Sequence, residues 1–376
     1  MKRIALLTIF LLLVVGTASA VTWADAGGCW TATDGAYSLV MWNATGTTSW
    51  TVPANVTSVE YLVIAGGGGG GFAYGGGGGA GGLVYGENKA VSGEVTVTVG
   101  AGGAAGTTSA QYSGANSVFS DIIALGGGAG GRGNTLFALN GGSGGGGAGY
   151  GKVTGAIATQ PGSYSEGFGR NGGNGVTSQK TSGGGGGANA VGGNGVTTVS
   201  GNGGAGKVYS ITGESMTYAG GGGGGSDAPS TPGTGGVGGG GNGGGATWPA
   251  GQTGYPGTNG LGGGGGGGSQ IANGGAGGSG VVIVRYSTTA PSASFDLVLT
   301  DTSIGVPTSW QWNATNLLGD NIPVTISTDQ NPILTLSQGN WLIDLIATND
   351  AGSDTCNSTI GINLTSPQVY FWSRTS

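Results

Sequence analysis

Few residues of this chain could do chemistry, and the commonest catalytic type is missing. The 376 residues include no histidine and only two cysteines, Cys29 and Cys356. The absence of histidine excludes serine–histidine and cysteine–histidine nucleophiles, and it removes the commonest general base and metal ligand. Two cysteines cannot form a structural zinc site. The carboxylates are scattered, without a paired motif for glycoside hydrolysis. We therefore expect no enzymatic activity, no metal and no cofactor.

One stretch imitates a phosphate-binding loop. Residues 201–208 read GNGGAGKV, which matches most of the motif, but Val208 stands where Ser or Thr would hold magnesium. The surrounding segment is so rich in glycine that such a near-match is expected by chance. The sequence therefore predicts no nucleotide site.

The chemistry that remains is recognition by aromatic side chains. Aromatic residues interrupt the glycine-rich segment 66–280 at scattered points, where exposed rings would supply contact area at low entropic cost. The candidate recognition residues are Phe137, Tyr164, Phe168, Tyr209, Tyr218, Trp248 and Tyr255. A structural interpretation stays open beside this one, in which the same rings staple the edges of the glycine segment.

The glycine segment 66–280 has to position these rings, so its own order matters. Strand-like runs flank it at residues 61–65 and 281–286, residues 95–99 alternate with period two, and its charges cancel. We expect a packed scaffold in which glycine runs form polyglycine-II-type helices, like polyproline II, that exchange hydrogen bonds with their neighbours. The alternative is a flexible glycine brush.

Residues 21–57 are short and aromatic, with Trp23, Trp30, Trp42 and Trp50. Residues 37–42 and 48–52 read as strands joined by a turn at residues 43–46. So short a segment could hardly bury its own core. We expect these strands to join the sheet formed by the flanks of the glycine segment, giving a β platform.

The stretch 50–65 (WTVPANVTSVEYLVIA), followed by six glycines, resembles the entry of a glycine-rich domain family. Residues 274–286 are similar to the end of that family's domain, and residues 97–103 and 114–119 also match its pattern. The resemblance covers about residues 48–286 and sets the glycine-rich domain at 58–286. It implies a β platform carrying a polyglycine-helix bundle, as in secreted microbial and phage tail proteins. It is also similar in character to phage adhesins whose bundle-end loops touch the host receptor, and it implies no catalytic site.

From residue 290 glycine becomes sparse and short strands are predicted at 294–300, 322–327, 333–336 and 341–347. Asp301, the Trp310–Trp312 pair and residues 347–353 resemble a PKD domain over residues 290–364, which implies an immunoglobulin-like β-sandwich. The chain departs from that family at residues 313–316 (NATN), where an Asp-Phe-Gly-Asp-Gly turn is usual. Residues 365–376 form a C-terminal tail.

Residues 1–20 have the pattern of a secretory signal peptide, with Lys2 and Arg3 before an apolar stretch and an Ala18-Ser19-Ala20 cleavage site. Its removal takes the formal net charge from −6 to −8, because two basic residues are lost. A negative chain disfavours nucleic-acid binding. We expect a secreted, cell-surface or virion protein without a transmembrane segment in its mature form.

Two further features, the cysteines and the asparagine sequons, matter if the protein is exported. Cys29 and Cys356 could pair, could stay free or could link to another chain. Triplets for N-glycosylation begin at Asn43, Asn55, Asn313, Asn357 and Asn363.

The leading hypothesis is a non-enzymatic exported surface or virion protein that displays recognition loops for adhesion or receptor binding. Its partner would be a surface protein or a glycan receptor, with envelope or virion assembly partners besides. The alternatives are a structural cell-envelope protein without a specific ligand and an accessory carbohydrate-binding protein.

Overall fold

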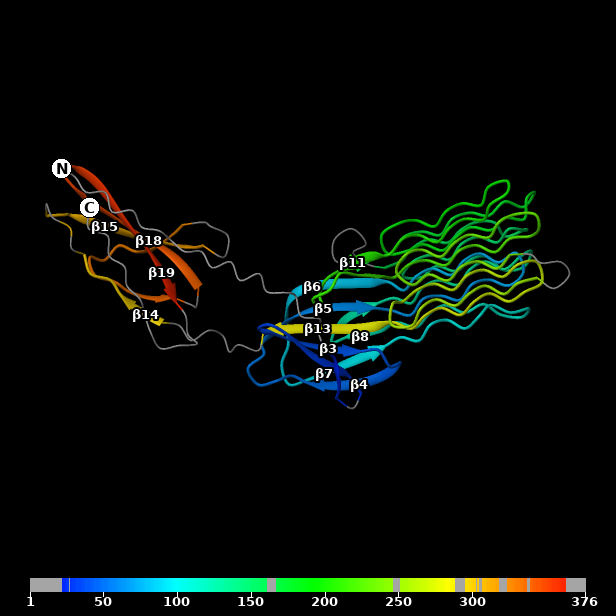
Figure 1. Ribbon diagram of the computed structural model, residues 1–376, viewed down its shortest axis with the longest axis horizontal. Helices are drawn as coiled ribbons and strands as arrows, with labels where there is room; N and C mark the ends of the chain where they lie inside the picture. The colour runs from blue at the N-terminus through cyan, green and yellow to red at the C-terminus, as the bar shows by residue number, and fades with distance from the viewer. Residues whose placement is uncertain are drawn as a thin grey trace. The chain divides into compact units, whose positions relative to one another are not determined.

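A computed structural model describes residues 22–26, 28–160, 167–245, 251–287, 295–301, 303, 306–317, 323–336 and 339–362. The chain divides into two compact units, Met1–Thr288 and Thr289–Ser376. Regular structure in these described ranges is β-strand without helix (Figure 1). The expected mainly β class is therefore confirmed. It follows that no described helix is long and apolar enough to cross a membrane.

The first unit is built on an antiparallel sheet in which the two flanks of the glycine segment lie side by side. Val282 pairs with Val63 across this junction. The sheet order is β1 (Ala24–Asp25), β2 (Trp30–Asp34), β3 (Tyr37–Trp42), β13 (Val281–Ser287), β5 (Ser58–Ile64), β6 (Leu83–Ala90) and β10 (Gly167–Phe168). The glycine segment thus leaves from β5 and returns through the adjacent β13.

A second antiparallel sheet packs against the first, and the two form the platform. Its order is β4 (Gly46–Thr51), β7 (Glu94–Val99), β8 (Ser117–Phe119) and β9 (Ile122–Ala124). Side chains alternate across β5, so Val63 packs with Val97 and Phe119 between the sheets while Leu62 and Ile64 face the other side. That other side is covered by residues from the hairpin of β11 (Lys207–Tyr209) and β12 (Met216–Tyr218). Both faces of the sheet are buried, which explains why β5 and β13 are nearly continuous apolar runs.

The N-terminal strands divide between the two sheets, whereas the sequence predicted that both would join one. β3 pairs with β13, but β4 pairs with β7 in the second sheet. The physical reason is that Trp42 and Trp50 meet across the core, with ring centroids 6.0 Å apart in an edge-to-face arrangement. Strands of one hairpin could not place these rings on facing sheets.

The glycine runs form a bundle of extended segments that lie side by side and lead away from the platform (Figure 1). The hydrogen bonds of residues 66–71 show how a run is held. The amides of Gly66 and Gly69 donate to Ala115 and Tyr112 at 3.0 and 2.9 Å. Gly67 and Gly70 donate to Gly278 and Gly275, both at 2.9 Å. Gly68 and Gly71 donate to Gly79 and Gly76, at 2.8 and 2.9 Å. Each run therefore bonds to three neighbouring segments in turn, and the direction repeats every three residues.

The expected polyglycine-II-type helices are not borne out, because the described residues contain no helix. The expected exchange of hydrogen bonds with neighbouring segments is nevertheless observed, because the run at 66–71 forms none of these bonds within itself and the backbone of other segments satisfies it. Close approach explains the need for glycine. A Cβ at Gly77 would overlap the carbonyl oxygen of Gly222, and one at Gly222 would overlap that of Gly265.

The second unit consists of two antiparallel sheets with an apolar core between them. One sheet contains β14 (Phe295–Val298) and β17 (Ile333–Leu336). The other has the order β16 (Val324–Ser327), β15 (Ser309–Asn316), β18 (Gly339–Asn349) and β19 (Gly352–Ile362). Leu297 and Leu334 from the first sheet pack with Trp312 and Ile343 from the second. β15 and β19 are strands that the sequence did not predict, because polar residues make up much of both.

Candidate functional site

The bundle ends, far from the platform, in a group of turns that we call the distal tip. Each turn joins an outgoing glycine segment to a returning one (Figure 1). Among the described residues, the distal tip consists of 72–74, 107–110, 132–137, 149–152, 176–181, 196–199, 226–231 and 269–272. Non-glycine residues collect here because the chain must turn and no neighbouring segment of the bundle lies beyond the turns.

Several turns of the distal tip hold residues in the left-handed backbone region. Ala73, Tyr74, Asn134 and Lys180 have φ of 46°, 52°, 59° and 52°. This region is costly for residues other than glycine and persists only where the surroundings enforce it. Backbone strain of this kind is common at functional sites.

Tyr74 is bound by three other segments of the bundle. Its amide donates to the carbonyl of Ser269 at 3.3 Å. Its carbonyl accepts from the amide of Gly149 and from the hydroxyl of Ser182, both at 2.8 Å. Contacts to three other segments therefore fix the position of this aromatic residue.

Cations lie on the aromatic rings around Tyr74. The Lys180 ammonium is 5.4 Å from the Tyr74 ring centroid, and the Tyr74 and Tyr150 centroids are 6.2 Å apart. Beside them, the Arg132 guanidinium carbon lies 5.5 Å from the ring of Phe72. The ring quadrupole attracts a cation at such distances.

A further pair lies next to these, where the Lys152 ammonium is 4.3 Å from the ring centroid of Phe137. The two groups are connected, because the amide of Asn134 donates to the carbonyl of Tyr150 at 2.7 Å. Phe137 and Tyr150 are about half exposed. The distal tip therefore presents rings and cations together.

Lys180 has a carboxylate partner. Its ammonium donates to Asp227 at 3.1 Å, and its side chain stays 45% exposed. The hydrogen bond to Asp227 raises the pKa of Lys180 above its usual range. The raised pKa keeps Lys180 charged. Because an ammonium has three N–H groups, Lys180 can also donate to an acceptor other than Asp227.

Apolar side chains surround these pairs. Those exposed in the turns of the distal tip are Leu136, Phe137, Tyr150, Val196, Val199 and Ile271. Exposed apolar side chains also occur along the bundle and on the platform, so these six add contact area to the distal tip without setting it apart.

The structure separates the predicted recognition residues. Phe137 lies in the distal tip. Phe168, Tyr209 and Tyr218 lie at the platform end of the bundle, in β10, β11 and β12. Tyr255 lies along the side of the bundle, where its hydroxyl accepts a hydrogen bond from Gln252 at 3.0 Å. Tyr164 and Trp248 lie outside the described residues.

The rings at the platform end pack against the sheet. Tyr218 is buried, and burial raises its pKa to about 12. The rings of Tyr209 and Tyr85 lie 4.7 Å apart, and the Lys207 ammonium is 4.0 Å from the centroid of Phe168. For these three predicted residues the structural interpretation fits the geometry better than recognition does.

Sequence reasoning missed most of the distal tip. Phe72 and Tyr74 stand between two glycine runs, and Tyr150 follows another. The rule that singled out Phe137 would have found them, since all are aromatic interruptions of glycine runs. The cations had no such signal, because their grouping depends on how the runs align.

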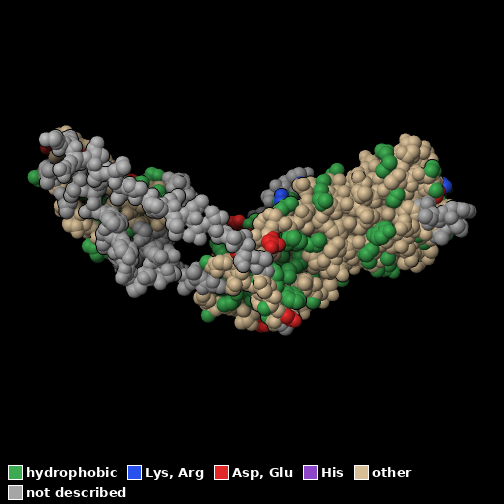
Figure 2. All heavy atoms as spheres, in the orientation of Figure 1, with side chains coloured by type: hydrophobic (Ala, Val, Ile, Leu, Met, Phe, Trp, Pro, Cys, Tyr) green, Lys and Arg blue, Asp and Glu red, His purple; other side chains and the backbone are tan. Residues whose placement is uncertain are grey.

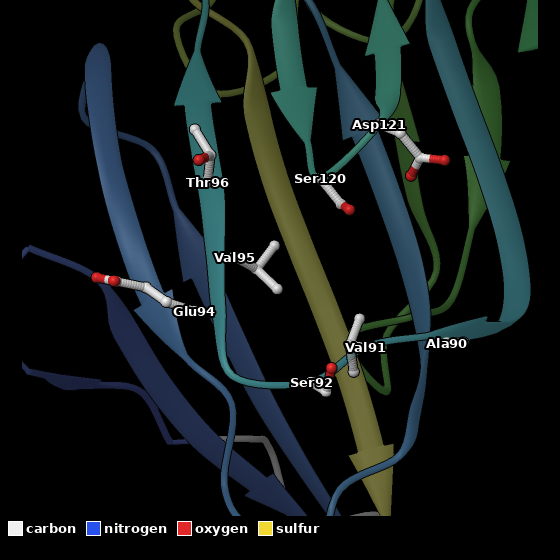
Figure 3. Close-up of a pocket in the computed structure, with 8 residues that line it drawn as sticks. All are labelled: Ala90, Val91, Ser92, Glu94, Val95, Thr96, Ser120 and Asp121. Carbon is white, nitrogen blue, oxygen red and sulfur yellow. The ribbon is translucent and has the colours of Figure 1, made fainter.

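A shallow hollow of about 540 Å³ lies at the other end of the first unit, between the start of β7 and the β8–β9 turn (Figure 3). Val91 and Val95 point into it, while the carboxylates of Glu94 and Asp121 point away on opposite sides (Figure 3). Asp121 forms an ion pair with Lys89, which lowers the pKa of its carboxyl. Diverging carboxylates cannot share a substrate or a metal. Nor does any group of three or more His, Cys, Asp or Glu suited to a metal occur among the residues that the structure describes.

Both cysteines are free thiols in the structure, and their pairing stays a prediction. Cys29 is half-buried, and burial together with the charge of Asp25 raises its pKa. Cys356 is exposed on β19 of the second unit.

The sequons differ in accessibility. Asn43, Asn55 and Asn357 are exposed and Asn313 is half-buried, while Asn363 lies outside the described residues. Their use stays a prediction.

Comparison with known proteins identifies one domain. The family model described as a glycine-rich domain matches residues 43–287, which takes in the whole bundle and the platform from β4 onward but not β1, β2 and β3. No curated protein matches the chain at a significant level.

Proposed function

The chain belongs to the glycine-rich domain family, and from this premise we propose that it is a non-enzymatic surface or virion protein whose distal tip binds a receptor. The bundle is the scaffold, and the turns at its end are the recognition loops. The residues that make contact are Phe137 and the newly found Phe72, Tyr74 and Tyr150.

One observation carries the proposal: the distal tip gathers two exposed rings, two half-buried rings and half-buried cations on a backbone that several segments fix. Binding residues usually stand on loops that a rigid scaffold positions. Aromatic and arginine side chains supply most of the binding energy of protein interfaces. Because the turns are held before binding, little ordering entropy is lost when a receptor is engaged.

The remaining parts of the proposal rest on the sequence alone. Residues 1–20 would direct export, and the second unit, as a PKD-like immunoglobulin-type module, would serve as a spacer or docking domain. The similarity in character to phage adhesins favours a virion or a cell surface as the location.

Attachment of the mature chain to cells tests the proposal. Fluorescently labelled protein is added to a panel of microbial cells, with the double variant Phe137→Ala/Tyr150→Ala compared with Tyr37→Ala. Tyr37 is a similarly exposed aromatic residue on β3 of the platform. We expect the double variant to lose at least about tenfold in attachment, as hot-spot aromatics do, and Tyr37→Ala to keep it.

Equal attachment by both variants would refute the distal tip as the binding surface. If the wild-type chain attaches to no cell in the panel, the structural cell-envelope alternative is favoured instead. Circular dichroism of the variants must match the wild type, so that loss of attachment reports the surface and not the fold.

A further inference from the structure

The distal tip differs in charge from the rest of the first unit. Its described cations are Arg132, Lys152 and Lys180, against the single carboxylate of Asp227. The described carboxylates elsewhere in this unit lie on the platform strands or the turns between them: Asp25, Asp34, Glu60, Glu87, Glu94, Asp121 and Glu214. Figure 2 shows acidic side chains mainly over the platform, and basic side chains both at the far end of the bundle and near the platform end.

This separation of charge selects an anionic partner. The whole chain carries a formal charge of −6, so an anionic surface repels most of the molecule. The distal tip, where three cations stand against one carboxylate, is attracted instead. Charge separation of this kind orients the protein during encounter and discriminates against partners of the wrong sign.

The arrangement of the cations indicates what kind of anion fits. They do not converge on one point, as they would around a single phosphate. Arg132 lies on Phe72, Lys180 on Tyr74 and Lys152 on Phe137, so each cation is paired with its own ring. The connected turns place these pairs side by side.

From this pattern we propose that the distal tip binds an acidic glycan, a polymer whose sugars carry carboxylate or sulfate groups. The inference rests on the proposed function and names the chemistry of its receptor. A ring offers an apolar face to the C–H face of a sugar, and the neighbouring cation pairs with the acidic group. Repeated ring–cation pairs match a polymer that repeats sugar and charge.

Lys180 and Asp227 give the proposal a test of sign. Asp227 holds one donor of the Lys180 ammonium and adds a negative charge to the distal tip. Asp227→Asn removes that charge. If the partner is anionic, this variant binds more tightly, whereas a role of the ion pair only in holding the turns predicts weaker binding.

The experiment measures binding of the mature chain to polygalacturonate and to heparin, with neutral dextran as the reference polymer. The test variants are Lys152→Gln/Lys180→Gln and Asp227→Asn. The matched control is Lys207→Gln, because Lys207 also lies on an aromatic ring but at the platform end.

We expect binding to at least one acidic polymer, weakening with salt, and none to dextran. The double lysine variant is expected to bind about tenfold more weakly. Asp227→Asn is expected to bind about two- to fivefold more tightly, since one like charge near the ligand is removed, and Lys207→Gln as tightly as the wild type.

Equal binding to dextran, equal loss with Lys207→Gln or weaker binding by Asp227→Asn would each overturn the inference. So would binding to phosphatidylglycerol vesicles without binding to either acidic polymer, which would identify a lipid surface. If Phe137→Ala/Tyr150→Ala abolishes attachment to cells but no acidic polymer binds, the acidic-glycan inference fails and the proposed function stands. If neither assay depends on the distal tip, both fail.

Discussion

The platform and the bundle of the first unit lie in one chain, yet different groups hold them together. In the platform, side chains such as Phe119 and Leu62 fill the space on either side of the sheet and are fully buried. In the bundle there are almost no side chains to bury, and amide-to-carbonyl bonds between segments take their place. The comparison teaches that a backbone can serve as a core if every polar group finds a partner. Such a core depends on spacing and not on apolar volume.

The largest effect should come from a cavity in the platform. Phe119→Ala removes a fully buried ring that lies 6.2 Å from Tyr61 and 6.3 Å from Trp50. We expect the free energy of unfolding to fall by about 3–5 kcal/mol, the usual cost of deleting such a ring. Urea denaturation measures it, and Tyr112→Ala on the exposed flank should change stability by less than about 0.5 kcal/mol. A loss below about 1 kcal/mol would mean that the platform does not depend on side-chain packing.

In the bundle the smallest side chain should already be harmful. Gly77→Ala places a methyl group against the carbonyl oxygen of Gly222, where only backbone could move. We expect a loss near the upper end of about 1–3 kcal/mol, as for overpacking. Hydrogen exchange should show faster exchange of the amides of Gly77 and its neighbours.

Gly245→Ala is the matched control for this variant. A Cβ at Gly245 would find its nearest atom 3.5 Å away, in Pro232. We expect its stability to match the wild type. If both glycine variants behave alike, close backbone approach is not what holds the bundle.

The junction between the two regions should be intermediate. The buried hydroxyl of Ser117 donates to the carbonyl of Ile64 at 2.7 Å and accepts from the amide of Gly100 at 2.9 Å. Ser117→Ala leaves both groups without this partner, at a cost of about 1–3 kcal/mol. Thermal unfolding measures it, with Thr47→Val as the exposed control. A neutral Ser117→Ala would show that water or a shifted neighbour replaces the hydroxyl.

The smallest effect concerns pH at the platform end. Burial raises the pKa of Tyr218 from 10.0 to about 12, so the folded state favours the neutral phenol. The contribution of the neutral phenol to the free energy of unfolding is complete below pH 10 and is lost as the pH rises through 12. At pH 11 the loss should be about 1 kcal/mol. Tyr218→Phe should remove that part of the alkaline decline in stability, and an unchanged decline would contradict the burial of the phenol.

How much of the structure could be predicted from the sequence differs between the platform and the bundle. The apolar runs in β5 and β13 predicted strands and a mainly β protein, because a two-faced core leaves a direct pattern in the chain. The prediction that β4 joins the sheet of β5 and β13 was wrong, since the sequence of β4 is equally consistent with pairing to β7 in the second sheet. The expected polyglycine-II-type helices were also not borne out, because the glycine runs carry no local signal that selects a conformation.

The candidate site divides in the same way. Phe137 could be singled out as an aromatic interruption of a glycine run, and Phe72 and Tyr74 were open to the same reasoning. That Phe168, Tyr209 and Tyr218 pack on the platform could not be read from the sequence, because they carry the same signal as Phe137.

By itself, the sequence predicted a packed scaffold over most of this protein, because only glycine permits backbones this close, and it made recognition the leading hypothesis for the function. The tertiary structure decided which interruptions meet. Glycine runs are alike, so nothing within them specifies their partners or their register. The platform strands from which they start, and the lengths of the turns that join them, bring Tyr74, Tyr150, Lys180 and Phe137 to one end. That end is where the protein is proposed to bind.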